Sequence, residues 1–284
     1  MNTVAVDIKR QPIPFRYPGG KFYALGLLAP FWQIEHDEFR EPFLGGGSVF
    51  FTKPKAKHNV LNDIDSELIT TYQTLQDPVK REILLNKLEK EIASKERWRE
   101  IFEFKPQNEI DVAYKYFYLN RTSFSGKLTS PAWGYREKRS LPPHRWHERI
   151  NPCGEKLEGA KIKSTDFEKI IDLPQKGKTT LMFVDPPYFS PPKKKHYRNG
   201  FNYEDHVRLM EALKRTKHKF FLTYDDILEI REMYKWAKIN EAKFFYRVDN
   251  SQEFNGSRRI GLELIITNYD IKKQLEIFND ECSR

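Results

Sequence analysis

The sequence predicts an α/β protein with a mainly parallel, doubly wound sheet that is interrupted by a mostly helical inserted region. Two short apolar strands, at residues 38–44 and 58–63, are each followed by a helical segment, and a run of glycines joins the first strand to its helix. Strands and helices alternate again after residue 159, with apolar strands at 180–184 and 218–226. This alternation is typical of sheets that bind a ligand at one edge.

Size and composition indicate a globular chain with one large core. The chain has 284 residues, of which 39% are hydrophobic and 31% charged, and it contains no low-complexity tract. It has neither an apolar stretch of about 18 residues nor the apolar core of a signal peptide. The two cysteines, Cys153 and Cys282, are too far apart to form a metal-ligand pair. We therefore expect a reduced, cytoplasmic protein without structural zinc or a membrane span.

The charge balance favours a polyanionic partner. The net charge is +9, the pI is about 9.3 and 14% of the residues are aromatic. Basic side chains bind phosphates by releasing counterions, and aromatic rings among them stack on bases. Nucleic acid suits this mixture, and a basic protein without such a partner is the alternative.

A glycine loop, PFLGGGS, follows the first strand at residues 42–48. Three glycines let the backbone turn tightly and approach a ligand without a Cβ in the way. The helix that starts at residue 48 points its N-terminus at that ligand, and Asp63, at the end of the second strand, suits ribose hydroxyls. A plain tight turn is the alternative, and the lack of a G-x-x-x-x-G-K-[ST] motif disfavours a P-loop NTPase.

A second loop with glycines, FRYPGGK, precedes the first strand at residues 15–21. Lys21 follows two glycines and precedes a helical run, so its ammonium suits a carboxylate or a phosphate. An exposed lysine in an N-terminal loop is the alternative.

The region after the second strand has a different character. A helix is expected at 66–76, residues 77–105 are charged and helical in period, and residues 111–121 are apolar and aromatic. Residues 122–159 are rich in Ser, Pro, Gly, Trp and Arg, and we expect them to be irregular. The charged segment has four apolar residues on one face: Leu84, Leu85, Leu88 and Ile92.

The α/β pattern then resumes, so we divide the chain into a catalytic domain at 1–67 and 159–284 and an inserted domain at 68–158. Asn202 is expected to cap a helix, which makes His206 a structural residue. The later elements are expected as a strand and helix within 160–171, helices at 205–215 and 227–238, and a hairpin of strands at 243–249 and 259–269.

The segment Asp-Pro-Pro-Tyr at 185–188 carries the strongest chemical signal. It ends an apolar strand, and Pro186 and Pro187 hold the backbone extended and donate no hydrogen bonds. The Asp185 carboxylate and nearby carbonyls therefore form a group of acceptors beside the Tyr188 ring. Such acceptors suit the exocyclic amine of a nucleobase, which stacking on the ring holds by about 1–3 kcal/mol. A strand end followed by a turn is the alternative.

Taken in order, these motifs resemble those of the Dam-type (D12 class, alpha group) DNA adenine-N6 methyltransferases. The resemblance implies a Rossmann-like sheet that binds S-adenosylmethionine (SAM), with an inserted, mostly helical DNA-recognition domain. The matching segments are RYPGGK (16–21), EPFLGGGSVF (41–50), NDIDSELI (62–69), YLNRTSFSG (118–126), STDF (164–167), DPPYF (185–189), FLTYDD (221–226) and LELIITNY (262–269).

The family's cofactor and catalytic residues map onto this sequence as follows. Asp185, Pro186, Pro187 and Tyr188 are implied to hold the target adenine, which must leave the duplex at a cost of a few kcal/mol. SAM is implied to leave as S-adenosylhomocysteine, without a metal. The implied SAM-binding residues are Tyr17, Lys21, Phe43, Gly45, Gly47, Asp63, Asp166, Phe167 and Asp185, although local sequence alone indicates an ordinary loop aromatic residue for Tyr17 and a helix N-cap for Asp166.

The resemblance also implies duplex DNA as the partner. Family members that read GATC carry an arginine shortly after the glycine that matches Gly126, whereas Lys127, Leu128 and Thr129 follow here, so we expect another recognition sequence. The residues placed to hold phosphate, intercalate and assist base flipping are Asn120, Arg121, Phe124 and Ser125, with a core position as the alternative for Phe124.

Two further basic stretches are candidates for the DNA surface, and solvated loops are the alternative for both. We hypothesise that a segment with Trp133, Tyr135 and Trp146 reads base edges through Arg136, Arg139 and Arg145. The run that follows the Asp-Pro-Pro-Tyr segment is expected to bind the target strand's phosphates through Lys193, Lys194 and Lys195.

The implied reaction is direct attack of the adenine N6 on the methyl group of SAM. We expect a monomer at the nucleoid of a bacterial or phage-infected cell, with a restriction endonuclease as a further candidate partner. One alternative is a cytosine-N4 methyltransferase, whose motif more often begins with Ser. Another is a non-catalytic DNA-binding relative, against which Lys21, Gly45, Asp63 and Asp185 argue.

Overall fold

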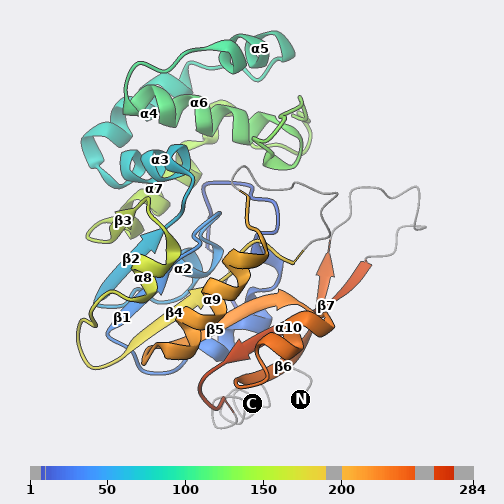
Figure 1. Cartoon of the computed structure of the whole chain (residues 1–284). Helices are drawn as coiled ribbons and strands as arrows, with labels where there is room; N and C mark the ends of the chain where they lie inside the picture. Colours follow the sequence, from blue (N-terminus) through green and yellow to red (C-terminus); the bar gives the residue numbers. More distant parts are fainter. Residues whose placement is uncertain (1–7, 10, 190–199, 247–258, 272–284) are drawn as a thin grey trace, which may run out of the picture.

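A computed structural model describes residues 8–9, 11–189, 200–246 and 259–271, and it has the predicted α/β architecture (Figure 1). Seven strands form one sheet in the order β3-β2-β1-β4-β5-β7-β6. The first five are parallel, and β7 is antiparallel to both of its neighbours. The strands are β1 (Glu38–Glu41), β2 (His58–Asn62), β3 (Lys161–Lys163), β4 (Thr180–Val184), β5 (Lys219–Asp225), β6 (Lys238–Tyr246) and β7 (Arg259–Thr267).

Helices cover both faces of the sheet, so its central strands are buried on each side (Figure 1). Leu181 and Phe183 of β4 belong to one core, whereas Met182 and Val184 belong to the other. The first core includes α1 (Leu25–Leu28), η2 (Ala29–Trp32) and α2 (Ser48–Thr52), and the second includes α8 (Phe167–Ile171), α9 (Tyr203–Arg215) and α10 (Leu228–Met233). Within the described ranges no helix is long and apolar enough to cross a membrane.

Between β2 and β3 the chain forms a group of helices that lies beyond the sheet (Figure 1). The ring of Phe15 meets those of Tyr72, Tyr116 and Phe117 edge-on, so the N-terminal loop, α3 and α6 share the core of the first sheet face. The helices are α3 (Ser66–Gln76), α4 (Pro78–Glu89), α5 (Lys95–Glu103), α6 (Glu109–Thr122) and α7 (His147–Leu157), with short 3-10 turns at η3 (Phe124–Gly126) and η4 (Pro143–Arg145). A further 3-10 turn, η1 (Lys21–Tyr23), lies before β1 in the N-terminal segment.

Helix α7 shows that the expectation of an irregular segment at 122–159 is wrong in its second half. Ile150, Cys153 and Leu157 are buried at helical spacing. Pro152 lies inside this helix and disguised the pattern. The burial of one apolar face therefore outweighs the backbone hydrogen bond that the proline cannot donate.

Two other boundaries also differ from the prediction. Ile92 is 65% exposed and does not continue the buried face, because α4 ends at Glu89. Strand β6 begins at Lys238, where the last turn of a helix was expected, since α10 ends at Met233. Pairing with β7 along the whole of β6 supplies the hydrogen bonds that favour the strand.

Candidate active site

The two loops with the strongest motifs meet at one edge of the sheet. Strands β1 and β4 are adjacent and parallel, so the glycine loop and the Asp-Pro-Pro-Tyr segment leave the same edge. The strand order reverses between these strands, and doubly wound sheets bind their ligands at such a point. A cavity of about 1300 Å³, counting the solvent at its mouth, opens here. Both loops line it, together with the N-terminal loop and residues 126–129 of the helical region.

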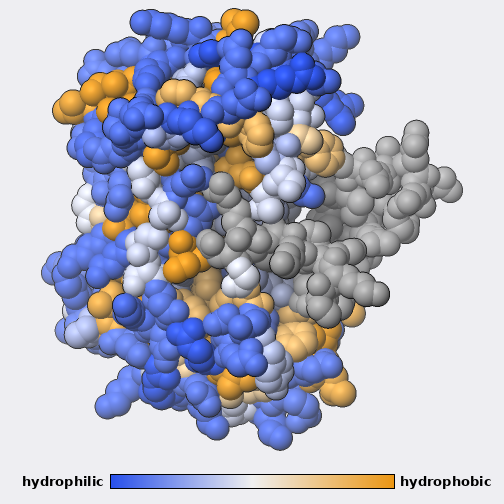
Figure 2. Space-filling view, turned by 45° about the horizontal axis from the view of Figure 1, so that its top comes forward, coloured by the Kyte–Doolittle hydropathy of each residue, from blue (hydrophilic) through white to orange (hydrophobic). Residues whose placement is uncertain are grey.

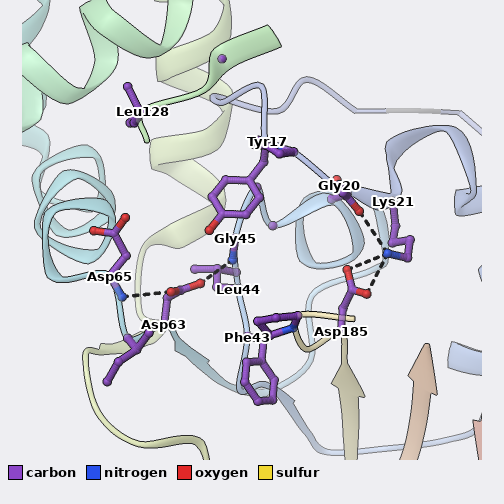
Figure 3. Close-up of a pocket in the computed structure, with 18 of the residues that line it drawn as sticks. Tyr17, Gly20, Lys21, Phe43, Leu44, Gly45, Asp63, Asp65, Leu128 and Asp185 are labelled. Carbon is purple, nitrogen blue, oxygen red and sulfur yellow. Dashed lines mark hydrogen bonds and ion pairs between the residues drawn. The ribbon is translucent and has the colours of Figure 1, made fainter. Parts of the chain in front are cut away.

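The glycine loop fits closely against the Tyr17 ring (Figure 3). Gly45 has a φ of 47° and Gly47 a φ of 65°, both in the left-handed region that favours glycine. A Cβ on Gly45 would lie 2.9 Å from the ring of Tyr17. The hydroxyl of Tyr72 donates to the Gly45 carbonyl at 2.9 Å and holds the loop from below. The loop and Tyr17 therefore form one preorganised wall of the cavity.

Asp63 follows β2, lines the cavity and is 9% exposed. Its carboxylate accepts hydrogen bonds from the N–H groups of Gly45, at 2.8 Å, and Asp65, at 3.0 Å. Burial raises the pKa of Asp63 to about 6, although these backbone hydrogen bonds act in the opposite direction. Each carboxylate oxygen can accept a further hydrogen bond, so Asp63 can bind a ligand while it closes the loop.

An ion pair joins the N-terminal loop to the end of β4 at the other side of the cavity (Figure 3). The Nζ atom of Lys21 lies 2.7 Å from Oδ1 of Asp185, and the Lys21 side chain is 6% exposed. The hydroxyl of Thr223, on β5, donates to the same carboxylate oxygen at 2.6 Å. Burial of Lys21 rules out an exposed loop lysine. Its partner, 164 residues away in the sequence, could not be identified from the sequence.

The ring of Tyr188 lies beside this ion pair. Lys21 Nζ is 4.8 Å from the ring centroid, within the range of a cation–π contact. The Tyr188 hydroxyl donates to Oε2 of Glu263, on β7, at 2.6 Å. Burial, and then the charge of Glu263, raises the pKa of Tyr188 well above its usual value, so the phenol stays protonated.

Two buried polar residues at this edge were missed by the sequence reading. Asn62 donates to the carbonyls of Pro42 and Thr165, each at 2.9 Å, and so joins the loops that follow β1 and β3. Glu41 ends β1, lines the cavity, and has no partner in the described part of the chain for its Oε2 atom. Burial, and then the charge of Asp185, raises the pKa of Glu41 well above its usual value. Its position directly before the glycine loop was the available signal.

Comparison with protein families identifies the chain. The model of the D12 class N6 adenine-specific DNA methyltransferases matches residues 17–255. The chain belongs to this family. It is therefore an adenine-specific DNA methyltransferase, and membership implies DNA as the substrate and SAM as the methyl donor.

Curated relatives agree with this assignment at modest identity. The type II methyltransferase M1.LlaDCHI of Lactococcus lactis subsp. cremoris is 28% identical over 90% of this chain and 95% of its own length. The type II methyltransferase M.CviBI of Paramecium bursaria Chlorella virus NC1A is 25% identical over 89% of this chain and 98% of its own. A DNA N-6-adenine-methyltransferase of Escherichia phage P1 is 28% identical over 82% of this chain, which aligns with 32% of that protein.

Two of the predicted SAM-binding residues of this methyltransferase, Asp166 and Phe167, lie outside the lining of the cavity. Phe167 stacks on Phe43, with ring centroids 5.3 Å apart, and so supports the wall from behind. Asp166 caps α8 by accepting from the Glu168 N–H at 2.9 Å, and Arg208 Nη2 lies 3.0 Å from its carboxylate. The N-cap interpretation of Asp166 is confirmed, and its contact with SAM stays a prediction. The predicted residues that line the cavity are Tyr17, Lys21, Phe43, Gly45, Gly47, Asp63 and Asp185.

Of the predicted target-base residues, Pro187 also lines the cavity, whereas Pro186 is buried behind it. The buried proline anchors the segment next to β4, which leaves Asp185 and Pro187 facing the cavity. Asn202 caps α9 in a capping box with Asp205, as expected. The buried His206 makes a hydrogen bond with the hydroxyl of Tyr224.

Asn120 occupies a structural position that differs from the predicted DNA contact. It is 1% exposed and accepts from the Arg16 N–H at 2.9 Å. Its amide donates to the carbonyls of Arg16, at 2.8 Å, and Gly126, at 3.1 Å. These bonds use both amide hydrogens, so in this arrangement Asn120 ties the N-terminal loop to the helical region and cannot reach a phosphate.

Arg121, the next residue, is 7% exposed, and its Nε atom has no hydrogen-bond partner among the residues that the structure describes. Burial, and then the charges of Arg16 and Arg149, lowers its pKa to about 9. A buried guanidinium beside two further arginines is costly unless an anion joins it. This arrangement therefore supports the expectation of a phosphate ligand.

Phe124 and Ser125 lie in a tight loop that the Ser123–Trp133 bridge closes. Phe124 is 40% exposed, so the alternative of a core phenylalanine is wrong. Ser125 has a backbone φ of 52°, which residues other than glycine rarely adopt. The strained turn places an exposed ring close to residues 126–129, which line the cavity.

The remaining basic candidates lie on the surface or outside the described residues. Arg136 and Arg139 are exposed in a turn of the helical region. The face of the molecule seen in Figure 2 is mostly hydrophilic, with paler and apolar side chains gathered across its middle. Lys193, Lys194 and Lys195 fall in the segment that the structure does not describe. No group of three His, Cys, Asp or Glu side chains in the described ranges is arranged to hold a metal ion.

Proposed function

We propose that the cavity holds SAM and the target adenine together, and that methyl transfer takes place beside Asp185. The observation that carries this proposal is that the glycine loop and the Asp-Pro-Pro-Tyr segment open into one cavity at the switch point of the sheet. Asp63 and Asp185 lie on opposite sides of Tyr17 and Gly45 (Figure 3). The end of the cavity at Asp63 then suits the ribose of SAM, and the end at Asp185 suits the methyl group and the target amine.

The residues of the cavity fit SAM, which when bound supplies an electrophilic methyl group on a sulfonium sulfur. Gly45 and Gly47 let the backbone approach the ligand, and Asp63 accepts hydrogen bonds from its ribose hydroxyls. The methionine part of SAM carries one ammonium and one carboxylate. The Oε2 atom of Glu41, which has no hydrogen-bond partner within the described ranges, suits the ammonium, and the buried cation of Lys21 suits the carboxylate.

SAM affinity should depend on pH through Asp63, whose pKa in the free protein is about 6. Only the ionised carboxylate accepts from both hydroxyls, so affinity should be full above pH 6 and fall by about tenfold per unit below it. Titration calorimetry between pH 5 and 8 measures this. Asp63→Asn should weaken binding at pH 8 and remove this pH dependence. An Asp63→Asn variant with the wild-type pH profile would contradict the assigned role.

We infer that Asp185 accepts hydrogen bonds from the N6 amine of the target adenine while Tyr188 stacks on the base. The amine's lone pair is delocalised into the ring, so acceptors on its N–H groups favour a pyramidal, more nucleophilic nitrogen. Thr223 fixes one Asp185 oxygen and thereby orients the carboxylate. The ammonium of Lys21 lies beside both Asp185 and Tyr188, so this carboxylate and ring suit a nitrogen that carries N–H groups. Positioning and fixed charge then provide most of the catalysis.

We further propose that residues 68–158 form the DNA-recognition domain. Arg121 and its neighbouring arginines supply a phosphate site, and the exposed ring of Phe124 wedges between bases near the cavity mouth. Lys127, Leu128 and Thr129 line the cavity, so the segment without the GATC-type arginine lies where the flipped base enters. This supports a recognition sequence other than GATC, with Arg136 and Arg139 as candidate readers.

Arg121→Ala should weaken DNA binding uniformly across sequences. Loss of one phosphate contact lowers the slope of log affinity against log salt by about one, and we expect affinity to fall by about tenfold. Because the guanidinium is buried without an acidic partner among the residues that the structure describes, thermal stability should not fall. Fluorescence anisotropy with duplex DNA at several salt concentrations measures the slope. Arg215→Ala removes the same charge at an exposed pair with Glu168 and Asp172 and should change neither quantity. An unchanged slope in Arg121→Ala would rule out the phosphate contact.

Pairing with a restriction endonuclease is supported by the two relatives that are type II methyltransferases. We propose a monomer that acts on chromosomal or phage DNA in the cytoplasm. The test of the proposed cavity is calorimetry with SAM and with S-adenosylhomocysteine. One site per chain that both ligands compete for is the expected result, and no binding of either ligand would favour a non-catalytic DNA-binding relative.

A further inference from the structure

The β6–β7 hairpin brings a buried carboxylate to the Asp-Pro-Pro-Tyr segment. Glu263, on β7, pairs in register with Asp225, the last residue of β5. The antiparallel strand extends past the end of β5, so Glu263 lies level with the loop that follows β4. It is 2% exposed, and its Oε2 atom accepts the hydroxyl of Tyr188 at 2.6 Å.

Stability alone does not account for this carboxylate. The Oε1 atom of Glu263 has no hydrogen-bond partner in the described part of the chain, and an unsatisfied buried acceptor costs free energy. The negative charges of Asp185 and Asp225 also act on Glu263, and the positive charge of Lys21 opposes them. An amide or an apolar residue of similar size would fit this site at lower cost.

We propose that Glu263 is a positioning residue that holds the Tyr188 ring in the orientation on which the target adenine stacks. This inference rests on the proposed role of Tyr188. A hydrogen bond from a phenol to a carboxylate is shorter and stronger than one between neutral groups. It holds the hydroxyl end of the ring, and with it both side-chain torsions of the tyrosine.

The carboxylate also makes the ring a better partner for positive charge. A charged acceptor pushes electron density into the phenol and strengthens the negative face of the ring. The cation–π contact of Lys21 shows that this face accepts a cation. During methyl transfer, positive charge passes from the sulfonium to the adenine amine, next to the same face.

Glu263→Gln should lower the single-turnover rate of methyl transfer by about 10- to 100-fold, as expected for a misplaced reacting group. The substrate is bacterial genomic DNA without adenine methylation, so the recognition sequence need not be known. The affinity for SAM and the melting temperature should stay at or above the wild-type values. Glu241→Gln makes the same change on β6, at a side chain that is 55% exposed, and should keep the wild-type rate.

A double-mutant cycle separates positioning from a general structural effect. Glu263→Gln replaces the charged acceptor of the Tyr188 hydroxyl by a neutral one, and Tyr188→Phe removes the hydrogen bond altogether. Glu263→Gln in the Tyr188→Phe background should therefore cause no further loss. The proposal would be overturned if the effects of the two substitutions on the rate were independent, or if Glu263→Gln had the wild-type rate. A wild-type protein that does not methylate adenine would instead contradict the proposed function itself.

The pH profile supplies a readout that a purely structural residue would not change. Burial raises the pKa of Glu263 to about 7, against the lowering effect of Lys21 and the Tyr188 hydrogen bond, and Asp185 and Asp225 raise it further. The ionised form is the better acceptor, so the wild-type rate should rise with pH through about 7. This rise of the rate with pH should be absent in Glu263→Gln. An identical rise in both proteins would count against the assignment.

Discussion

Asp185→Ala should abolish methyl transfer while leaving SAM binding largely intact. Asp185 directly follows β4, and its carboxylate is oriented by the Thr223 hydroxyl and by the ion pair with Lys21. It lies at the end of the cavity that we assign to the target base. A preorganised group of this kind typically contributes about 10²–10³-fold to the rate, and loss of base positioning adds to that factor. We therefore expect a decrease of at least about 10³-fold in single-turnover transfer of labelled methyl groups.

SAM affinity in the same variant distinguishes catalysis from cofactor binding. Removing Asp185 frees Lys21 from its ion pair, so its ammonium stays available for a ligand carboxylate. Asp185→Asn keeps one acceptor and should retain more activity than Asp185→Ala. Asp172→Ala is a matched control at an exposed residue that pairs with Arg215, and it should behave as wild type. Wild-type rates in Asp185→Ala would refute the role assigned to this carboxylate.

Gly45→Ala should lower SAM affinity by about 100-fold or more. The added Cβ would lie 2.9 Å from the Tyr17 ring, and a φ of 47° is strained for alanine. The wall of the cavity must then shift, because Asp63 and Tyr72 hold the same residue through its N–H and its carbonyl. Titration calorimetry with SAM measures the loss.

Gly159→Ala is the matched control for backbone strain. Gly159 has a φ of 75°, but a Cβ there would meet nothing within 4 Å. Both variants therefore lose the conformational freedom of glycine, and only Gly45→Ala disturbs the cavity. Equal SAM affinities in the two variants would show that the fit of the loop against Tyr17 is not needed.

The sequence could predict the parts of the site that depend on strand ends. The motifs after β1 and β4 were expected at one edge because parallel strands bring their carboxyl ends together, and both line one cavity. Asp63 was predicted for the same reason. Each of these signals is local, since the residue type and the strand that precedes it are adjacent in the chain.

Contacts between distant segments could not be predicted. Lys21 and Asp185 meet across 164 residues, and Glu263 reaches Tyr188 only because β7 lies beside β5 in the sheet order. Neither pair has a sequence spacing that identifies it. The buried state of Asn120 likewise depends on the Arg16 backbone, which the N-terminal loop brings to α6. The boundaries of α7 and β6 depend on tertiary packing that overrides local propensity.

The most direct test of the central claim is mass analysis of nucleosides from unmethylated DNA that has been incubated with SAM and the protein. The expected product is N6-methyladenine, formed by the wild type and absent with Asp185→Ala. Formation of N4-methylcytosine, or of N6-methyladenine at equal rates by both proteins, would contradict the account of a flipped adenine held by Asp185.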